Sequence, residues 1–168
     1  MFFRIVKSLV LLCLPLSLSY CSSDDSEVVT GVNGETYMEA KIDGRIWKAA
    51  FVLQSQTNAN GVAMLLITGG RPSDQNLEAI IIQLANITQP DSFTIDTLST
   101  QSMPYASAIY TRGTEDVPED FMSVSGFVNL TVRDERRVSG TFEFQGIEEN
   151  DFSKTVSITA GKFNTPLE

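Results

Sequence analysis

The chain has 168 residues, a formal net charge of −9 and no histidine. A protein this acidic is a poor partner for nucleic acid or for an anionic lipid surface, because both require a basic patch. The lack of histidine excludes Ser-His-Asp and Cys-His catalytic sets and the usual histidine-containing zinc sites. We therefore expect a protein that is not an enzyme, holds no metal or cofactor, and does not bind nucleic acid.

Residues 1–20 are expected to be an export signal. Arg4 and Lys7 precede an apolar run at 8–19, as is typical of a secretory signal peptide. The run is shorter than the ~20 apolar residues that span a bilayer, so a membrane-spanning helix is the less favoured alternative. Removal of these two cations would change the net charge from −9 to −11.

Cys21 directly follows this signal. The residues Leu18, Ser19 and Tyr20 before it resemble the bacterial lipobox, although Tyr20 replaces the usual small residue. The resemblance implies acylation of the Cys21 thiol; the alternative is ordinary secretion with a free thiol. Cys13 would be removed with the signal, so no cysteine pair would remain to form a disulfide.

Residues 21–33 are predicted to be a flexible acidic tether, and residues 34–168 a single β-domain. The tether begins with CSSDDS, which resembles the signal that sends lipoproteins of Bacteroidota to the cell surface. We therefore expect a lipid-anchored protein of the cell outer membrane, exposed either to the periplasm or at the surface.

The domain is predicted to contain strands only. Asp43-Gly44 is a strong signal for a tight hairpin turn, and the strand after it would place Trp47, Phe51 and Leu53 on one face. The predicted strands, with turns and loops such as 54–60 and 112–120 between them, are 35–42, 45–53, 61–68, 77–84, 93–96, 105–111, 124–132, 138–144 and 155–163.

Two of these strands, 61–68 and 77–84, are apolar almost throughout. Such runs are typical of central strands that are buried, and the run Ile80, Ile81 and Ile82 disfavours a helix.

The last three strands instead alternate between apolar and polar residues. The pattern places Val128, Leu130, Phe142 and Phe144 in a core, with interior glycines that leave room for a large ring. The fold class that we predict is a single-domain antiparallel β-sandwich or up-and-down β-barrel with meander connections.

Three segments occur in an order that resembles a known family. They read AKIDGRIWKA at 40–49, RVSGTFEF at 137–144 and VSITAGKF at 156–163. The sequence resembles a group of Bacteroidota lipoproteins of unknown function that are DUF6252-like, over about residues 38–163. The resemblance implies an all-β domain on an outer membrane, and it implies no catalytic residues.

Four aromatic residues are candidates for a ligand surface: Tyr37, Trp47, Tyr105 and Tyr110. Tyrosine and tryptophan present a flat apolar face with a polar tip, which suits sugars and peptides. The alternative is that they close the ends of the core, and that Trp47 anchors the hairpin from inside.

Two acidic segments are the remaining candidates for chemistry. A glycosidase needs two carboxylates about 5–10 Å apart, and Ca²⁺ takes several oxygen ligands from loops. Solvated turns are the simpler interpretation, because neither segment has the spacing of a calcium loop. The carboxylates concerned are Glu115, Asp116, Glu119 and Asp120 in the first segment, and Glu148, Glu149 and Asp151 in the second.

The expected function is a non-catalytic binding or interaction module, held to the membrane by an N-terminal lipid, with a glycan or an envelope protein as partner. The alternative is a carrier of a small apolar ligand in a barrel cavity. An interior volume of at least ~300 Å³ would favour the carrier.

Overall fold

The computed structural model describes residues 35–59, 61–73, 76–96, 103–114 and 116–167. The expected signal peptide, the tether and Cys21 lie outside these residues. Among the described residues, no helix is long and apolar enough to cross a membrane. The described strands are β1 (Tyr37–Ile42), β2 (Arg45–Lys48), β3 (Phe51–Ala59), β4 (Val62–Ser73), β5 (Asn76–Ala85), β6 (Ser92–Asp96), β7 (Tyr105–Gly113), β8 (Pro118–Arg133), β9 (Arg137–Glu148) and β10 (Thr155–Pro166).

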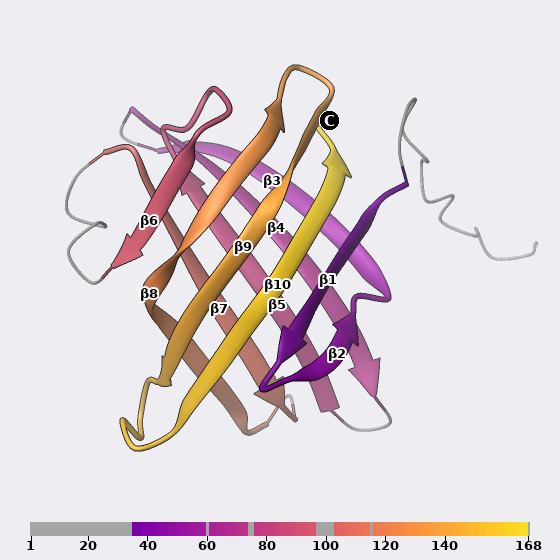
Figure 1. Cartoon of the computed structure of the whole chain (residues 1–168), viewed down its shortest axis with the longest axis vertical. Coiled ribbons are helices and arrows are strands. Elements are labelled where there is room, and N and C mark those ends of the chain that lie inside the picture. Colours follow the sequence, from indigo (N-terminus) through magenta and orange to yellow (C-terminus); the bar gives the residue numbers. More distant parts are fainter. Residues whose placement is uncertain (1–34, 60, 74–75, 97–102, 115, 168) are drawn as a thin grey trace, which may run out of the picture.

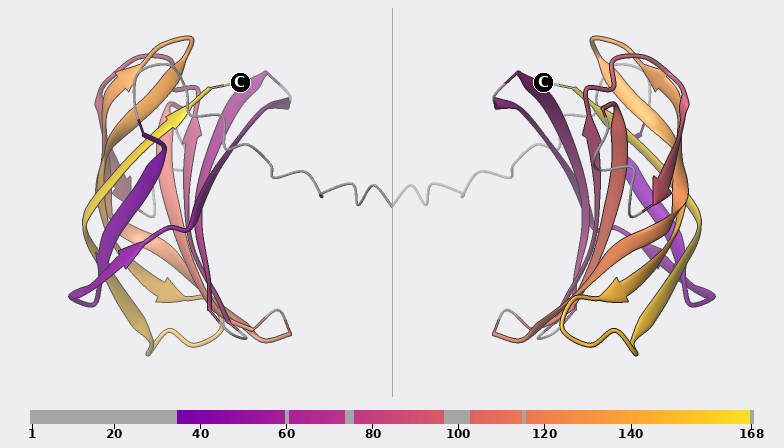
Figure 2. Two further views of the ribbon diagram at one scale, coloured as in Figure 1. Left: turned by 90° about the vertical axis from the view of Figure 1, so that its right-hand side faces the viewer. Right: turned by 90° about the vertical axis from the view of Figure 1, so that its left-hand side faces the viewer.

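These strands form one antiparallel sheet, shown in Figure 1. The order is β2-β1-β10-β9-β8-β7-β5-β4-β3, and β6 pairs with β8 beside β7. The sheet curls into a half-barrel (Figure 2). Its two end strands, β2 and β3, follow each other directly in the chain. The predicted all-β fold with meander connections is confirmed.

The chain passes from one end of the sheet to the other at Ala49 and Ala50. The Ala49 amide donates to the carbonyl of Met38 in β1 at 2.9 Å, and the Ala50 amide donates to that of Gly70 in β4 at 2.8 Å. The single strand predicted at 45–53 is therefore wrong, because the backbone changes partner at this step. The loop predicted at 54–60 is also wrong, since β3 pairs with β4 along its whole length.

The hairpin before this step forms as predicted. Asp43 and Gly44 have φ angles of 48° and 80°, the positive values that such a turn requires. The Asp43 carboxylate also accepts a hydrogen bond from the Ser157 amide at 2.9 Å, and the Asp43 amide donates to the Ser157 carbonyl. The turn is thereby fixed to β10. In Figure 1 it lies at the lower end of the barrel, whereas the β8–β9 turn and residue 167 lie at the upper end.

The core has the register that the alternation predicts. Val128, Leu130, Phe142 and Phe144 are all buried, and Phe142 lies 6.2 Å from Phe163 between ring centroids. Such pairs of aromatic rings add to the stability that burial alone provides. The face shared by Trp47, Phe51 and Leu53 is not observed, because Trp47 is fully buried while Leu53 is 61% exposed. The step at Ala49 and Ala50 separates their faces.

Two interior glycines are required for different reasons. Gly126 has a φ of 144°, and a Cβ there would lie 2.1 Å from the carbonyl oxygen of Glu143, so it permits a close approach of β9 rather than of a ring. At Gly161 a Cβ would meet the Phe142 ring at 2.6 Å. The expectation that the interior glycines Gly126 and Gly140 leave room for a large ring is therefore wrong, because a Cβ at Gly140 would also meet a backbone carbonyl, that of Asn129, at 2.4 Å. Of the three glycines, Gly161 is the one whose Cβ would meet a large core ring.

We expect Phe142→Ala to lower the free energy of unfolding by about 3–5 kcal/mol, because it removes a fully buried ring from a tightly filled core. Chemical denaturation would measure the loss. Phe152→Ala is the matched control: its side chain is 80% exposed, and we expect almost no change. Equal effects of the two substitutions would contradict the assigned core.

Candidate functional site

The structure separates the four aromatic candidates. Trp47 and Tyr110 are 0% and 1% exposed, so both belong to the core. Tyr37 is 41% exposed on β1, and Tyr105 is half-buried at the start of β7. Because β10, β9 and β8 lie between these two strands in the sheet, the four side chains do not form one surface. The burial of Trp47 agrees with its interpretation as an anchor of the hairpin.

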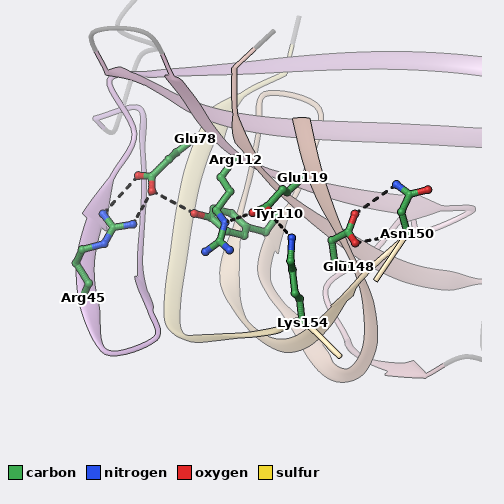
Figure 3. Close-up of polar contacts among 8 residues, drawn as sticks. All are labelled: Arg45, Glu78, Tyr110, Arg112, Glu119, Glu148, Asn150 and Lys154. Carbon is green, nitrogen blue, oxygen red and sulfur yellow. Dashed lines mark hydrogen bonds and ion pairs between the residues drawn. The ribbon is translucent and has the colours of Figure 1, made fainter. Parts of the chain in front are cut away.

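A chain of polar contacts occupies the lower end of the barrel, as Figure 3 shows. The Arg45 guanidinium lies 2.6 Å from the Glu78 carboxylate, which also accepts a hydrogen bond from the Tyr110 hydroxyl at 3.1 Å. Burial, followed by the negative charge of Glu78, raises the pKa of Tyr110. The phenol is therefore held neutral as a donor, and the contacts join β2, β5 and β7.

Carboxylates of the first acidic segment make ion pairs and hydrogen bonds at the same lower end of the barrel. The Glu119 carboxylate lies 2.5 Å from the Lys154 ammonium and 2.7 Å from Nε of Arg112. The hydrogen bonds from Lys154 and then from Arg112 lower the pKa of Glu119. Asp120 accepts a hydrogen bond from the Thr111 hydroxyl at 2.7 Å, and Glu115 lies outside the described residues. The strand β7 continues to Gly113 and β8 begins at Pro118, so most of the predicted loop at 112–120 is strand.

The second acidic segment forms the turn between β9 and β10. Glu148 is only 4% exposed and accepts hydrogen bonds from the amide and the side chain of Asn150 (Figure 3). Asp151 accepts hydrogen bonds from the amide and the hydroxyl of Ser153. Within the described ranges, no group of three or more Asp or Glu side chains is placed to hold a metal ion. These contacts stabilise turns and strand ends.

A different feature lies on the outside of the barrel. One row of directly paired residues crosses six neighbouring strands, and we call it the outer belt. Leu53 and Met122 in this row are 61% and 43% exposed, and the others are partly exposed. The outer belt consists of Leu53 of β3, Thr68 of β4, Ile81 of β5, Ile109 of β7, Met122 of β8 and Ile147 of β9.

The surface around the outer belt carries no charge on four of these strands. The charged residues of β4, β5 and β7 are Arg71, Glu78 and Arg112, and all of them stand at the alternate, inward-facing positions. On β1 and β10, by contrast, Glu39 and Lys162 lie between buried neighbours and face outward. Figure 2 shows β3 and β4 bowed, with their outward side concave.

The upper end of the barrel holds a groove of about 360 Å³ that is open to solvent. We call it the upper groove. Its walls are formed by β3, β4, β5, the loop after β5 and the end of β8. Arg133 is the one charged residue among the described residues that line it. The others are apolar or neutral: Gln56, Thr57, Asn58, Ala63, Met64, Leu65, Leu84, Ile87 and Thr88.

Arg133 also borders a second hollow of about 420 Å³, where Asp134, Glu135 and Leu167 are further lining residues. Partial burial lowers the pKa of Arg133, and the charge of Asp134 opposes this effect. No carboxylate among the described residues lies within ion-pair distance of the Arg133 guanidinium. Its Nε makes a long contact of 3.5 Å with the Ile87 carbonyl.

Sequence reasoning missed both the outer belt and the upper groove. The signal for the belt was present, because the segments 61–68 and 77–84 are apolar on both strand faces, whereas a sheet with one solvated face alternates. The prediction that these two strands are buried is therefore correct for one face only. Leu66 and Ile81 are in fact partly exposed, so the described residues leave this outer face partly open to solvent. No short motif marks the groove.

We expect the contribution of Glu119 to stability to depend on pH. A carboxylate whose pKa is lowered by folding stabilises the fold above its ordinary value of 4.5 and loses this effect as the pH falls through the folded-state pKa. Glu119→Gln should therefore be less stable than the wild type at neutral pH, and the difference should narrow below pH 4.5. Chemical denaturation across this range measures it.

Glu135→Gln is the control, since this side chain is exposed in the β8–β9 turn. It should change the stability little at any pH in the series. A difference between Glu119→Gln and the wild type that stays constant from neutral pH to pH ~3 would contradict the proposed role of the ion pairs.

Comparison with known proteins places the fold in a family. No curated protein and no solved structure matches the chain. Residues 34–165 match the family described as Domain of unknown function (DUF6252), which spans almost all of the described strands. The chain therefore belongs to the DUF6252 family.

Proposed function

We propose that this protein is a lipid-anchored lipoprotein of the outer membrane or cell surface in a member of the Bacteroidota. Its role is non-catalytic: it contacts another envelope protein. The support for the anchor comes from the sequence, where an apolar run and the lipobox-like residues precede Cys21. The acidic residues 21–33 would hold the domain at a distance from the lipid.

The outer belt is the observation that carries the role in protein contact. Five large apolar side chains in a row of six paired residues, interrupted by Thr68 and without a charge on the neighbouring outward positions of β3, β4, β5 and β7, are typical of a surface that another protein covers. A glycan would instead favour several exposed aromatic rings beside polar groups. Trp47 and Tyr110 are buried, and Tyr37 and Tyr105 lie on strands that are separated by three others in the sheet. The belt therefore favours a protein partner over a glycan.

The carboxylates support a non-catalytic role. Glu78 and Glu119, at the lower end of the barrel, are each paired with a cation and lie in a region of hydrogen-bonded side chains. Two carboxylates with different protonation states across a cleft are what a glycosidase requires. The paired carboxylates instead connect strands.

A second candidate function is the carriage of a small ligand. The upper groove favours it, because its volume of about 360 Å³ falls in the range of small-molecule sites. The groove is open rather than enclosed, and the core below it is filled by side chains such as Trp47 and Phe142. A ligand would therefore bind at the mouth of the barrel and not in a central cavity.

We expect Cys21→Ser to release the protein from the membrane, because serine cannot accept the thioether-linked lipid of a lipoprotein. Cell fractionation together with labelling by an alkyne fatty acid measures both effects in one culture. Cys13→Ser is the matched control and should leave both unchanged, since residue 13 belongs to the removed signal. Membrane-bound Cys21→Ser protein without label would contradict the anchor.

We expect the double variant Leu53→Glu, Met122→Glu to lose partner proteins, because it places two charges in the outer belt at exposed positions. Quantitative mass spectrometry after crosslinking in intact cells compares it with the wild type. Ile46→Glu is the control, since Ile46 is 67% exposed on β2 and stands outside the belt. The same set of partners for all three proteins would contradict a role of the belt.

A further inference from the structure

The residues that line the upper groove indicate which class of small ligand it would bind, provided that the second candidate function, the carriage of a small ligand, is correct. The groove combines two unlike features. Leu65, Leu84 and Ile87 on one side are buried or nearly buried apolar side chains at the edge of the core. Arg133, at the end of β8, brings a permanent positive charge to the same space.

The charge of Arg133 is not neutralised within the described part of the chain. No described carboxylate lies within ion-pair distance, and the hydrogen bond that the guanidinium makes to a described residue is the long contact from Nε to the Ile87 carbonyl. Neither terminal nitrogen of the guanidinium has a hydrogen-bond partner among the described residues, so both can donate to a ligand. A partly buried charge without a partner is unfavourable, so a ligand that supplies an anion would gain free energy at this position.

The nearest carboxylate in the sequence does not serve this purpose. Oδ1 of Asp134 accepts hydrogen bonds from the amides of Arg136 and Arg137 at 2.8 and 2.9 Å, so it is engaged in holding its own turn. Glu135 borders the second hollow and not the upper groove. The overall charge of −9 opposes an anion at long range, but salt screens that field beyond about 8–10 Å, whereas a contact with the guanidinium is direct.

We propose that the upper groove binds a small anionic amphiphile, whose acid group pairs with Arg133 and whose hydrocarbon part lies along Leu65, Leu84 and Ile87. Gln56 and Asn58 lie beside this apolar wall, because they pair with Leu65 and Ala63 of β4, and their side-chain amides can hydrogen bond to further polar atoms of the ligand. The planar fork of an arginine matches a carboxylate or a phosphate in two parallel hydrogen bonds. The apolar wall alone would accept a neutral ligand, so Arg133 determines the preference for an acid.

The test compares decanoate with decanol, which share a hydrocarbon chain and differ in charge. Isothermal titration would use the full chain, with the wild type and three variants: Arg133→Met, Arg133→Lys and Arg136→Met. We expect the wild type to bind decanoate about tenfold or more tightly than decanol, as one charge-assisted pair implies. Arg133→Met should remove this preference, and Arg133→Lys should keep part of it.

Arg136→Met is the matched control. It removes an exposed arginine of the same turn and should keep the full preference for decanoate. Equal binding of decanoate and decanol by the wild type would overturn the role of Arg133 and would leave carriage of a small ligand standing. Binding of neither probe would overturn both the inference and the second candidate function. Neither result would affect the role of the outer belt, because that surface lies on the outside of the barrel.

Discussion

The half-barrel depends on the step at Ala49 and Ala50, where two consecutive amides donate to different strands, β1 and β4. This pair of hydrogen bonds connects the two ends of the sheet order. The ion pair between Arg45 and Glu78 joins β2 to β5 and so also links the two ends of the sheet. Polar contacts join the strands at the lower end, and the upper groove lies at the opposite end of the barrel.

The strands at the C-terminal end could be predicted well because one rule governs them. Each has a core face and a solvated face, and the alternation of Phe142 and Phe144 with polar neighbours predicts which residues lie on each face. The break after Lys48 was missed for a physical reason. A change of hydrogen-bonding partner alters no side chain, so residues 45–53 retain the pattern of one continuous strand.

The candidate site was harder to predict than the fold. Apolar residues on both faces of β4 and β5 indicate that both faces are covered, but a sequence does not say whether the covering residues belong to the same chain or to another protein. Glu119 and Glu148 looked like members of two separate loops, and both belong to strands that pair side by side. Arg133 is the first of five consecutive charged residues, 133–137, and only its position at the groove distinguishes it.

Gly126 has a consequence for how sequences with this fold can diverge. Any larger residue at this position would direct a carbon atom into the backbone of the next strand, at the Glu143 carbonyl. A descendant of this chain that loses the glycine must therefore change how β8 pairs with β9 at this position. The residue aligned with position 126 would separate relatives that keep this strand register from those that have abandoned it.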